Sequence, residues 1–106
     1  MRWVKIFADR NAANDRLVEN KPQLLVVEGK HICLVKQGEN IYAVSDTCTH
    51  NGESLSKGKV NHIGEIICPW HGHQFNLKTG REFQQRSADV SCYLIKEEAD
   101  GLYIGV

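Results

Sequence analysis

The segments Cys48-Thr49-His50 and Cys68-Pro69-Trp70-His71 decide how this chain is interpreted. Each brings a thiol and an imidazole together over a very short spacing, C-x-H in the first segment and C-x-x-H in the second, and residues 51–67 separate them. Each segment lies in a turn-rich stretch, with Gly52 after the first and Gly72 after the second. Two cysteines and two histidines in this pattern indicate a metal or redox centre held by two loops.

Length and composition set the limits of the interpretation. The chain has 106 residues, which is one domain of ordinary size, and 42% hydrophobic residues suffice for a modest core. Thirteen basic and thirteen acidic residues cancel, so nothing indicates a nucleic-acid or anionic-membrane partner. No apolar run approaches the length of a membrane span. Met1–Lys5 has no export signal, so we expect a cytoplasmic location, where four cysteines favour metal or redox chemistry over disulfides.

Short strands with turn residues between them are expected along the whole chain, with no sustained helical period. Residues 9–21 are polar and are expected to form a loop with one helical turn near 14–17, and residues 45–59 an irregular loop. This pattern predicts an all-β fold, a small antiparallel sandwich or barrel. The expected strands are Arg2–Ala8, Leu24–Val27, His31–Lys36, Ile41–Val44, Ile63–Cys68, Gln74–Leu77, Ser91–Lys96 and Leu102–Val106.

The two motifs resemble the ligand loops of Rieske [2Fe–2S] proteins, specifically small Rieske ferredoxins of the oxygenase type. The flanking stretches Leu55-Ser56-Lys57-Gly58 and Phe75-Asn76-Leu77 add to the resemblance, which runs from Trp3 to Ile104. It implies a single Rieske domain over residues 1–106. The implied fold is all-β, with a Rieske-like antiparallel β-sandwich or barrel base and a small inserted cluster-binding subdomain at about residues 45–83.

The resemblance also implies the cofactor, one Rieske-type [2Fe–2S] cluster. In a Rieske centre two cysteines hold one iron and two histidines hold the other. The implied ligands are therefore Cys48 and Cys68 on one iron, and His50 and His71 on the other. Two cysteinates leave the oxidised centre formally neutral, so it accepts an electron more easily than a four-cysteine dianion. Rieske potentials accordingly span roughly −150 to +300 mV, against about −400 mV for plant-type ferredoxins.

Four residues predict a potential in the lower part of that range. High-potential members of the family carry a disulfide between the loops, and the matching positions here are Glu53 and Trp70. Those members also donate hydrogen bonds from a serine and a tyrosine, where this chain has His73 and Phe75. In addition, the Gln84–Ser87 stretch stands where a proline-rich crossing over the cluster is common in the family.

Simpler interpretations exist for the cysteines and histidines. Two Cys and two His could form a structural zinc site, although C-x-H fits zinc-finger spacing poorly. Cys33 and Cys92 lie in apolar runs and are expected to be small buried hydrophobes rather than a disulfide. His31 and His62 have no ligand-like partner in the sequence and are expected at the surface or in strand hydrogen bonds. His73 is left open, as a tuning or a docking residue.

The expected function is one-electron transfer, not catalysis. A Rieske oxygenase needs a second domain with mononuclear iron, typically held by two histidines and a carboxylate, and no such set or nucleophile–base pair is seen. By resemblance the chain would relay electrons from a flavin-containing reductase to a terminal oxygenase of a dioxygenase system. The exposed edges of the two ligand histidines would be the electron exit, surrounded by a docking surface of Asn51, Gly52, Trp70, Gly72 and His73. The alternative is a small Rieske-fold subunit of an NAD(P)H nitrite reductase. The reductase, the acceptor, the pathway's substrate and the oligomeric state stay open.

Overall fold

The computed structural model describes residues 1–106, and its regular secondary structure consists mostly of short antiparallel strands. Three sheets form, in the orders β1-β10-β9, β2-β3-β4-β8 and β5-β6-β7. The expected all-β antiparallel fold is confirmed. The elements are β1 (Trp3–Phe7), α1 (Arg10–Arg16), β2 (Gln23–Val27), β3 (Lys30–Gln37), β4 (Asn40–Ser45), the 3-10 turn η1 (Leu55–Lys57), β5 (Lys59–Val60), β6 (Glu65–Ile67), β7 (Gln74–Asn76), β8 (Cys92–Tyr93), β9 (Ile95–Glu98) and β10 (Gly101–Gly105).

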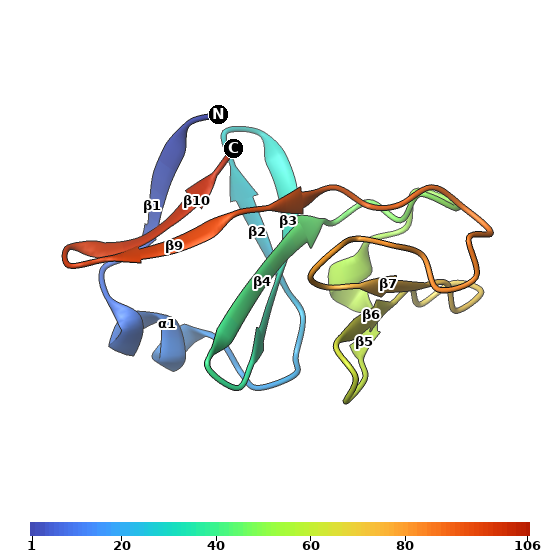
Figure 1. Cartoon of the computed structure of the whole chain (residues 1–106), viewed down its shortest axis with the longest axis horizontal. Helices are drawn as coiled ribbons and strands as arrows, with labels where there is room; N and C mark the ends of the chain where they lie inside the picture. The colour runs from blue at the N-terminus through green and yellow to red at the C-terminus, as the bar shows by residue number, and fades with distance from the viewer.

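The first two sheets make a base, and the third sheet stands at its side (Figure 1). The chain from β8 to β9 runs from one base sheet to the other, because β8 pairs with β4 whereas β9 pairs with β10. Leu94 interrupts what the sequence predicted as one strand over residues 91–96 and is 61% exposed. Its carbonyl still accepts a hydrogen bond from the Gly105 N–H at 2.9 Å, so the break transfers the chain between sheets without losing that pairing.

The helix α1 was only partly anticipated. A single turn near residues 14–17 was expected, but the helix begins at Arg10 and ends at Arg16. The cause is an N-cap, because the Asp9 carboxylate accepts a hydrogen bond from the Ala12 N–H at 2.7 Å. Ala13 faces inward and is fully buried, which ties the helix to the base. No helix in the structure has the length and apolar character that a membrane span requires.

Two separate hydrophobic cores hold the molecule together. One lies inside the base and is formed by α1 and the strands of the two base sheets. The other lies between the β3–β4 hairpin and the third sheet, and it contains both motif cysteines. Alternation along β3 explains how one hairpin serves both cores, since Ile32 and Leu34 face the base core while Cys33 and Val35 face the other. The motif loops are therefore attached to the base through a core of their own.

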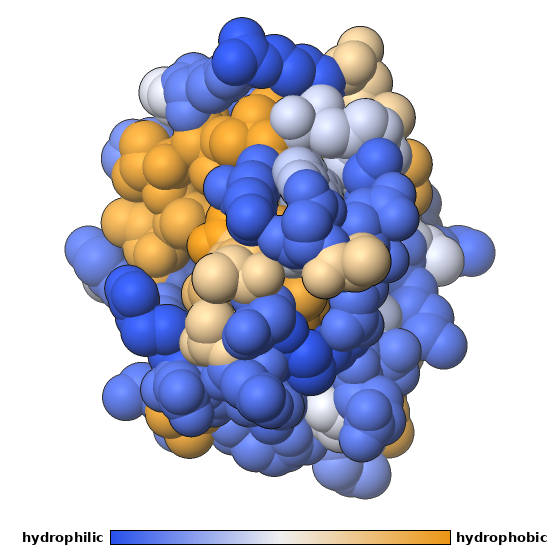
Figure 2. All heavy atoms as spheres, turned by 90° about the vertical axis from the view of Figure 1, so that its left-hand side faces the viewer, coloured by the Kyte–Doolittle hydropathy of each residue, from blue (hydrophilic) through white to orange (hydrophobic).

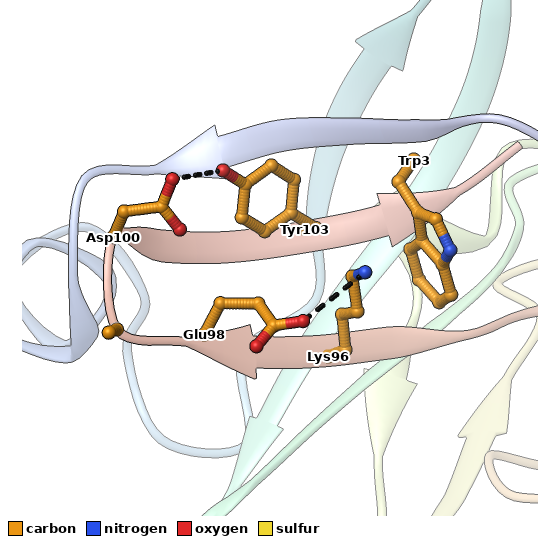
Figure 3. Close-up of a pocket in the computed structure, with 6 residues that line it drawn as sticks. Trp3, Lys96, Glu98, Asp100 and Tyr103 are labelled. Atoms are coloured by element: carbon orange, nitrogen blue, oxygen red, sulfur yellow. Dashed lines mark hydrogen bonds and ion pairs between the residues drawn. The ribbon is translucent and has the colours of Figure 1, made fainter.

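Surface features away from this second core follow from how the base is packed. Figure 2 shows apolar side chains gathered on part of the face at the left of Figure 1. An apolar groove of about 100 Å³ lies between β1, α1 and β2 and is lined by residues such as Phe7, Leu17 and Leu24. A wider hollow of about 460 Å³ lies on the β1-β10-β9 sheet (Figure 3). There the Lys96 Nζ lies 4.4 Å from the Trp3 ring centroid and 3.3 Å from a Glu98 oxygen. The ammonium group of the hollow is therefore already paired with a carboxylate and an aromatic ring of the same hollow.

Candidate metal centre

The first motif forms a tight loop closed by its own backbone. The Cys48 N–H donates to the Glu53 carbonyl at 2.8 Å, and the Gly52 N–H donates back to the Cys48 carbonyl at 2.8 Å. Gly52 has φ of +78°, a conformation that glycine adopts without a steric penalty. Buried Asp46 fastens the end of the loop, because its carboxylate accepts hydrogen bonds from the Ser54 hydroxyl and the Ser56 N–H. Cys48 is thus held inward and is 1% exposed, while His50 remains at the surface.

The second motif repeats the closure of the first. The Cys68 N–H donates to the His73 carbonyl at 2.8 Å, which spans the same number of residues as the Cys48–Glu53 bond. His71 has φ of +67° and Gly72 has φ of +68°. A non-glycine residue in the left-handed region is uncommon and is found where a loop must aim a side chain. The turn buries Cys68, which is 2% exposed, and leaves His71 at the surface.

The two loops bring all four motif side chains to one place. The His50 and His71 rings lie edge to face, with centroids 5.6 Å apart. Beneath them the two thiols are close enough to interact electrostatically. The Cys68 Sγ also lies 3.9 Å from the Asn51 Oδ1 of the first loop. The sequence-predicted ligands are therefore assembled as two buried sulfurs under two exposed imidazoles.

This donor set fits a two-iron cluster better than a single zinc ion. A structural zinc ion needs four ligands around one point, and no group of three or more His, Cys, Asp or Glu side chains is placed to hold one metal ion. A [2Fe–2S] cluster needs two protein ligands on each iron. Burial, as the largest cause, raises the pKa of the Cys68 thiol to about 11. Ligation must therefore displace a proton from that thiol.

A third segment, Glu82–Ser87, braces the two loops, and it includes the stretch that stands at the family's proline-rich crossing, although no motif marks Glu82 or Ser87 as a supporting residue. The buried Glu82 carboxylate accepts hydrogen bonds from the Gln84 N–H at 3.1 Å and from the Arg86 N–H at 2.6 Å. The Arg86 Nε lies 3.5 Å from the same carboxylate. Although burial opposes ionisation, these donors and the Arg86 charge together hold the pKa of Glu82 below its ordinary value. The turn so formed delivers Ser87 to the junction of the two motif loops, where its hydroxyl bonds both Thr49 and His73.

Two sequence-based expectations need correction. Cys33 is buried as expected, but Cys92 is exposed, because it lies at the end of the four-stranded sheet on β8, where it pairs only with Val44 of β4. Burial raises the pKa of the Cys33 thiol to about 12. His73 was placed in the exposed docking surface but is only 5% exposed. Its burial, aided by the Arg86 charge, lowers its pKa, so the ring is neutral near neutral pH.

The other surface expectations hold. Both cysteines outside the motifs are free, as the disulfide argument predicted. His31 and His62 are exposed and lie outside the ligand loops. Trp70 is 57% exposed beside His71, with the two rings edge to face at 5.5 Å. Asn51, Gly52 and Gly72 are also exposed, so the ring of small and polar residues around the imidazole edges is present without His73.

Comparison with known proteins identifies the family. The family described as Rieske [2Fe-2S] domain matches residues 3–94. A 3-phenylpropionate/cinnamic acid dioxygenase ferredoxin subunit from Shigella flexneri serotype 5b (strain 8401) is 32% identical over 69% of this chain and 70% of its own length. Ferredoxin CarAc from Metapseudomonas resinovorans is 35% identical over 74% of this chain and 68% of its own length.

Solved structures agree with the fold. One, a complex of reduced oxygenase and oxidized ferredoxin in carbazole 1,9a-dioxygenase, matches with a TM-score of 0.79 and 26% identity over 96% of this chain and 100% of the matched chain. A putative NADH-dependent nitrite reductase small subunit from Mycobacterium tuberculosis has a TM-score of 0.81 over 99% of this chain and 96% of its own. At 18% identity that second likeness shows the fold alone.

The two sulfurs and two imidazoles, the family match across most of the chain and the ferredoxin relatives lead to one assignment. The chain belongs to the Rieske [2Fe–2S] family, and it is an electron carrier that holds a cluster of that type.

Proposed function

We propose that Cys48 and Cys68 hold one iron of the cluster and that His50 and His71 hold the other. The burial of both sulfurs beneath two solvent-facing imidazoles supports this division. The buried side of the centre keeps the sulfur ligands away from water, while the imidazole edges reach the surface where a partner can approach. We also propose that the cluster-binding subdomain covers about residues 45–83 of a single domain.

In this proposal the chain accepts an electron from a flavin-containing reductase and delivers it to a terminal oxygenase in the cytoplasm. A relative that is 32% identical is a 3-phenylpropionate/cinnamic acid dioxygenase ferredoxin subunit, which supports the oxygenase as acceptor. Exposed Trp70 lies beside His71 and offers an apolar contact at the point where the electron leaves. Weak electron-transfer complexes use small interfaces, so a few such contacts suffice.

A small subunit of a nitrite reductase is the second candidate, favoured only by the shared fold. The two candidates differ in how they bind their partner. A ferredoxin forms a transient complex whose association weakens as salt rises, whereas a subunit remains bound to its large partner during purification. Affinity purification of the tagged chain from its native cells at low and high salt separates them.

The buried sulfur pair beneath two exposed imidazoles is the observation that carries the proposal, and an EPR-monitored redox titration tests it. We expect the reduced protein to give a Rieske-type signal, with a potential that falls at alkaline pH as the oxidised-state histidines lose protons. Either His50→Cys or His71→Cys should weaken this pH dependence, because only one ligand imidazole remains, or should cause loss of the cluster, while His62→Cys should preserve both. A chain that binds metal without labile sulfide would contradict the proposal.

A further inference from the structure

His73 packs directly against a proposed ligand. Its ring stacks on the His50 ring with centroids 4.0 Å apart and an angle of 8° between the planes. The two residues belong to different loops, so the contact joins the loops through their side chains. Because His73 is 5% exposed, its ring has little room to turn away from this stack.

Ser87 forms a hydrogen bond at the edge of the His73 ring. Its hydroxyl lies 3.0 Å from the His73 Nδ1 and 3.1 Å from the Thr49 hydroxyl. The Thr49 hydroxyl also donates to the Ala88 carbonyl, so the first loop is bonded twice to this segment. One hydroxyl thus bonds Thr49, next to the ligand His50 in the first loop, and His73, two residues after the ligand His71 in the second.

The segment that carries Ser87 is itself rigidly defined. Glu82 is fully buried, and its carboxylate accepts hydrogen bonds from the Gln84 and Arg86 N–H groups. These bonds fix the turn just before Ser87. The Gln85 side-chain amide adds a hydrogen bond to the Glu82 carbonyl at 2.7 Å. This segment contains no proline, so side-chain hydrogen bonds rather than a fixed φ angle determine its shape.

We propose that Ser87 and His73 are positioning residues that fix the ring plane of His50 where it binds iron. The Ser87 hydroxyl sets the rotation of the His73 ring, and the face of that ring sets the plane of His50. This inference rests on the proposed function, because it takes His50 as a cluster ligand. Nearly parallel rings with centroids 4.0 Å apart are in van der Waals contact across their faces, and this contact narrows the range of His50 conformers.

The orientation of a ligand imidazole affects the electronic structure of the iron it binds, so spectroscopy can detect its loss. We would compare purified wild-type, Ser87→Ala and Ser87→Thr proteins at equal iron content per chain. Reduced-state EPR line shape, pulsed-EPR nitrogen hyperfine couplings of the two ligand histidines and the redox potential are the readouts. We expect Ser87→Ala to broaden the EPR lines, to widen the distribution of the nitrogen hyperfine coupling of one ligand histidine, and to shift the redox potential. Ser87→Thr, which keeps the hydroxyl, should restore wild-type values.

A double-mutant cycle tests whether Ser87 acts through His73. His73→Phe keeps a flat ring against His50 but removes the nitrogen that Ser87 bonds. If the inference is right, adding Ser87→Ala in the His73→Phe background changes the spectra no further. Ser91→Ala makes the same chemical change at an exposed serine with no side-chain hydrogen bond, and it should leave the coupling of the ligand histidines unchanged.

The outcomes are distinct. If wild-type protein gives no Rieske signal, the proposed function fails before this inference is reached. If wild type gives the signal and Ser87→Ala matches it in line shape, coupling and potential, the positioning role is wrong. It is also wrong if Ser87→Ala has its full effect in the His73→Phe background, since Ser87 would then act through the first loop.

Discussion

Phe75 lies in the core beneath the motif loops, fully buried, at the position where high-potential relatives donate a tyrosine hydroxyl. A phenyl ring cannot stabilise the added negative charge of the reduced centre by hydrogen bonding. We therefore expect a potential in the lower part of the roughly −150 to +300 mV range. Phe75→Tyr should raise it, as measured by redox titration. A wild-type potential well above the middle of the range would contradict the prediction, and exposed Phe83→Tyr serves as the control.

The Glu82 carboxylate should make the third segment sensitive to acid. Its folded-state pKa is depressed, so its stabilising contribution is present above the unfolded-state pKa of about 4.3 and is lost as pH falls through the lower folded value. Glu82→Gln should cost about 1–3 kcal/mol at neutral pH, because a neutral amide accepts hydrogen bonds less strongly. Thermal unfolding of both proteins between neutral and acidic pH measures the difference, which should narrow below about pH 4.3. A difference independent of pH would refute the role, and exposed Glu39→Gln is the control.

Sequence reasoning reached the four proposed ligands but not the residues that support them. Two cysteine–histidine pairs at such short spacing are typical of metal and redox centres, so their motif is specific. Ser87 is an ordinary polar residue whose role arises from contacts with Thr49 and His73, which are distant in the chain. Glu82 accepts hydrogen bonds from backbone N–H groups of its own turn, and no pattern of residue types marks that role. His73 could be placed near the site, but its burial depends on the stack with His50 and on Ser87, which no local pattern encodes.

At the scale of elements, two glycines with nearly equal backbone angles allow a matched test of packing. Gly80 ends the turn after β7 with φ of +78°, and Gly29 lies in the β2–β3 hairpin with φ of +79°. A Cβ on Gly80 would lie 2.1 Å from the Val90 carbonyl oxygen, whereas nothing lies within 4 Å at Gly29. Gly29→Ala should cost about 1–2 kcal/mol of unfolding free energy from backbone strain alone. Gly80→Ala should cost about 1–3 kcal/mol more through the clash.

Chemical denaturation of both variants gives the two free energies. Equal losses would show that Val90 moves away freely and that the turn after β7 is not packed against the segment leading to β8. A larger loss at Gly80 would establish that the third sheet and the base are joined through this close approach, in agreement with the Val90 N–H bond to the Gly80 carbonyl at 2.9 Å.

Most strands could be predicted, and the exceptions have physical causes. Hairpins such as β3–β4 have apolar runs on both sides of a glycine turn, so their signal is local. The two-residue strand β5 was not expected, and Lys59 is the last residue of the loop expected over residues 45–59. The pairing of β5 with β6 is decided by tertiary contact rather than by a pattern of its own. The start of α1 depends on one side-chain cap at Asp9, which outweighs the polar composition of the segment.

Across the whole molecule, the stability of the two cores should depend on the cluster to different degrees. The base core contains no motif residue, whereas the second core includes Cys48 and Cys68 among its buried members. If Cys48 and Cys68 hold the cluster as proposed, its removal takes away their ligand bonds, while the base loses nothing directly. The stability of the two parts should therefore respond unequally to metal removal.

Hydrogen exchange after anaerobic removal of the cluster by a chelator tests this division. We expect amide protection in β1, β10 and the base core to persist, while protection in β5, β6, β7 and the motif loops falls sharply. The β3–β4 hairpin should retain intermediate protection, because one of its faces packs on each core. Uniform loss would mean that the chain folds as one cooperative unit, and unchanged protection would mean that the second core is stable without its cluster. Either result would contradict the proposed division into a cluster-independent base and a cluster-dependent second core. A bound cluster can selectively stabilise only a part of the chain that unfolds separately from the rest.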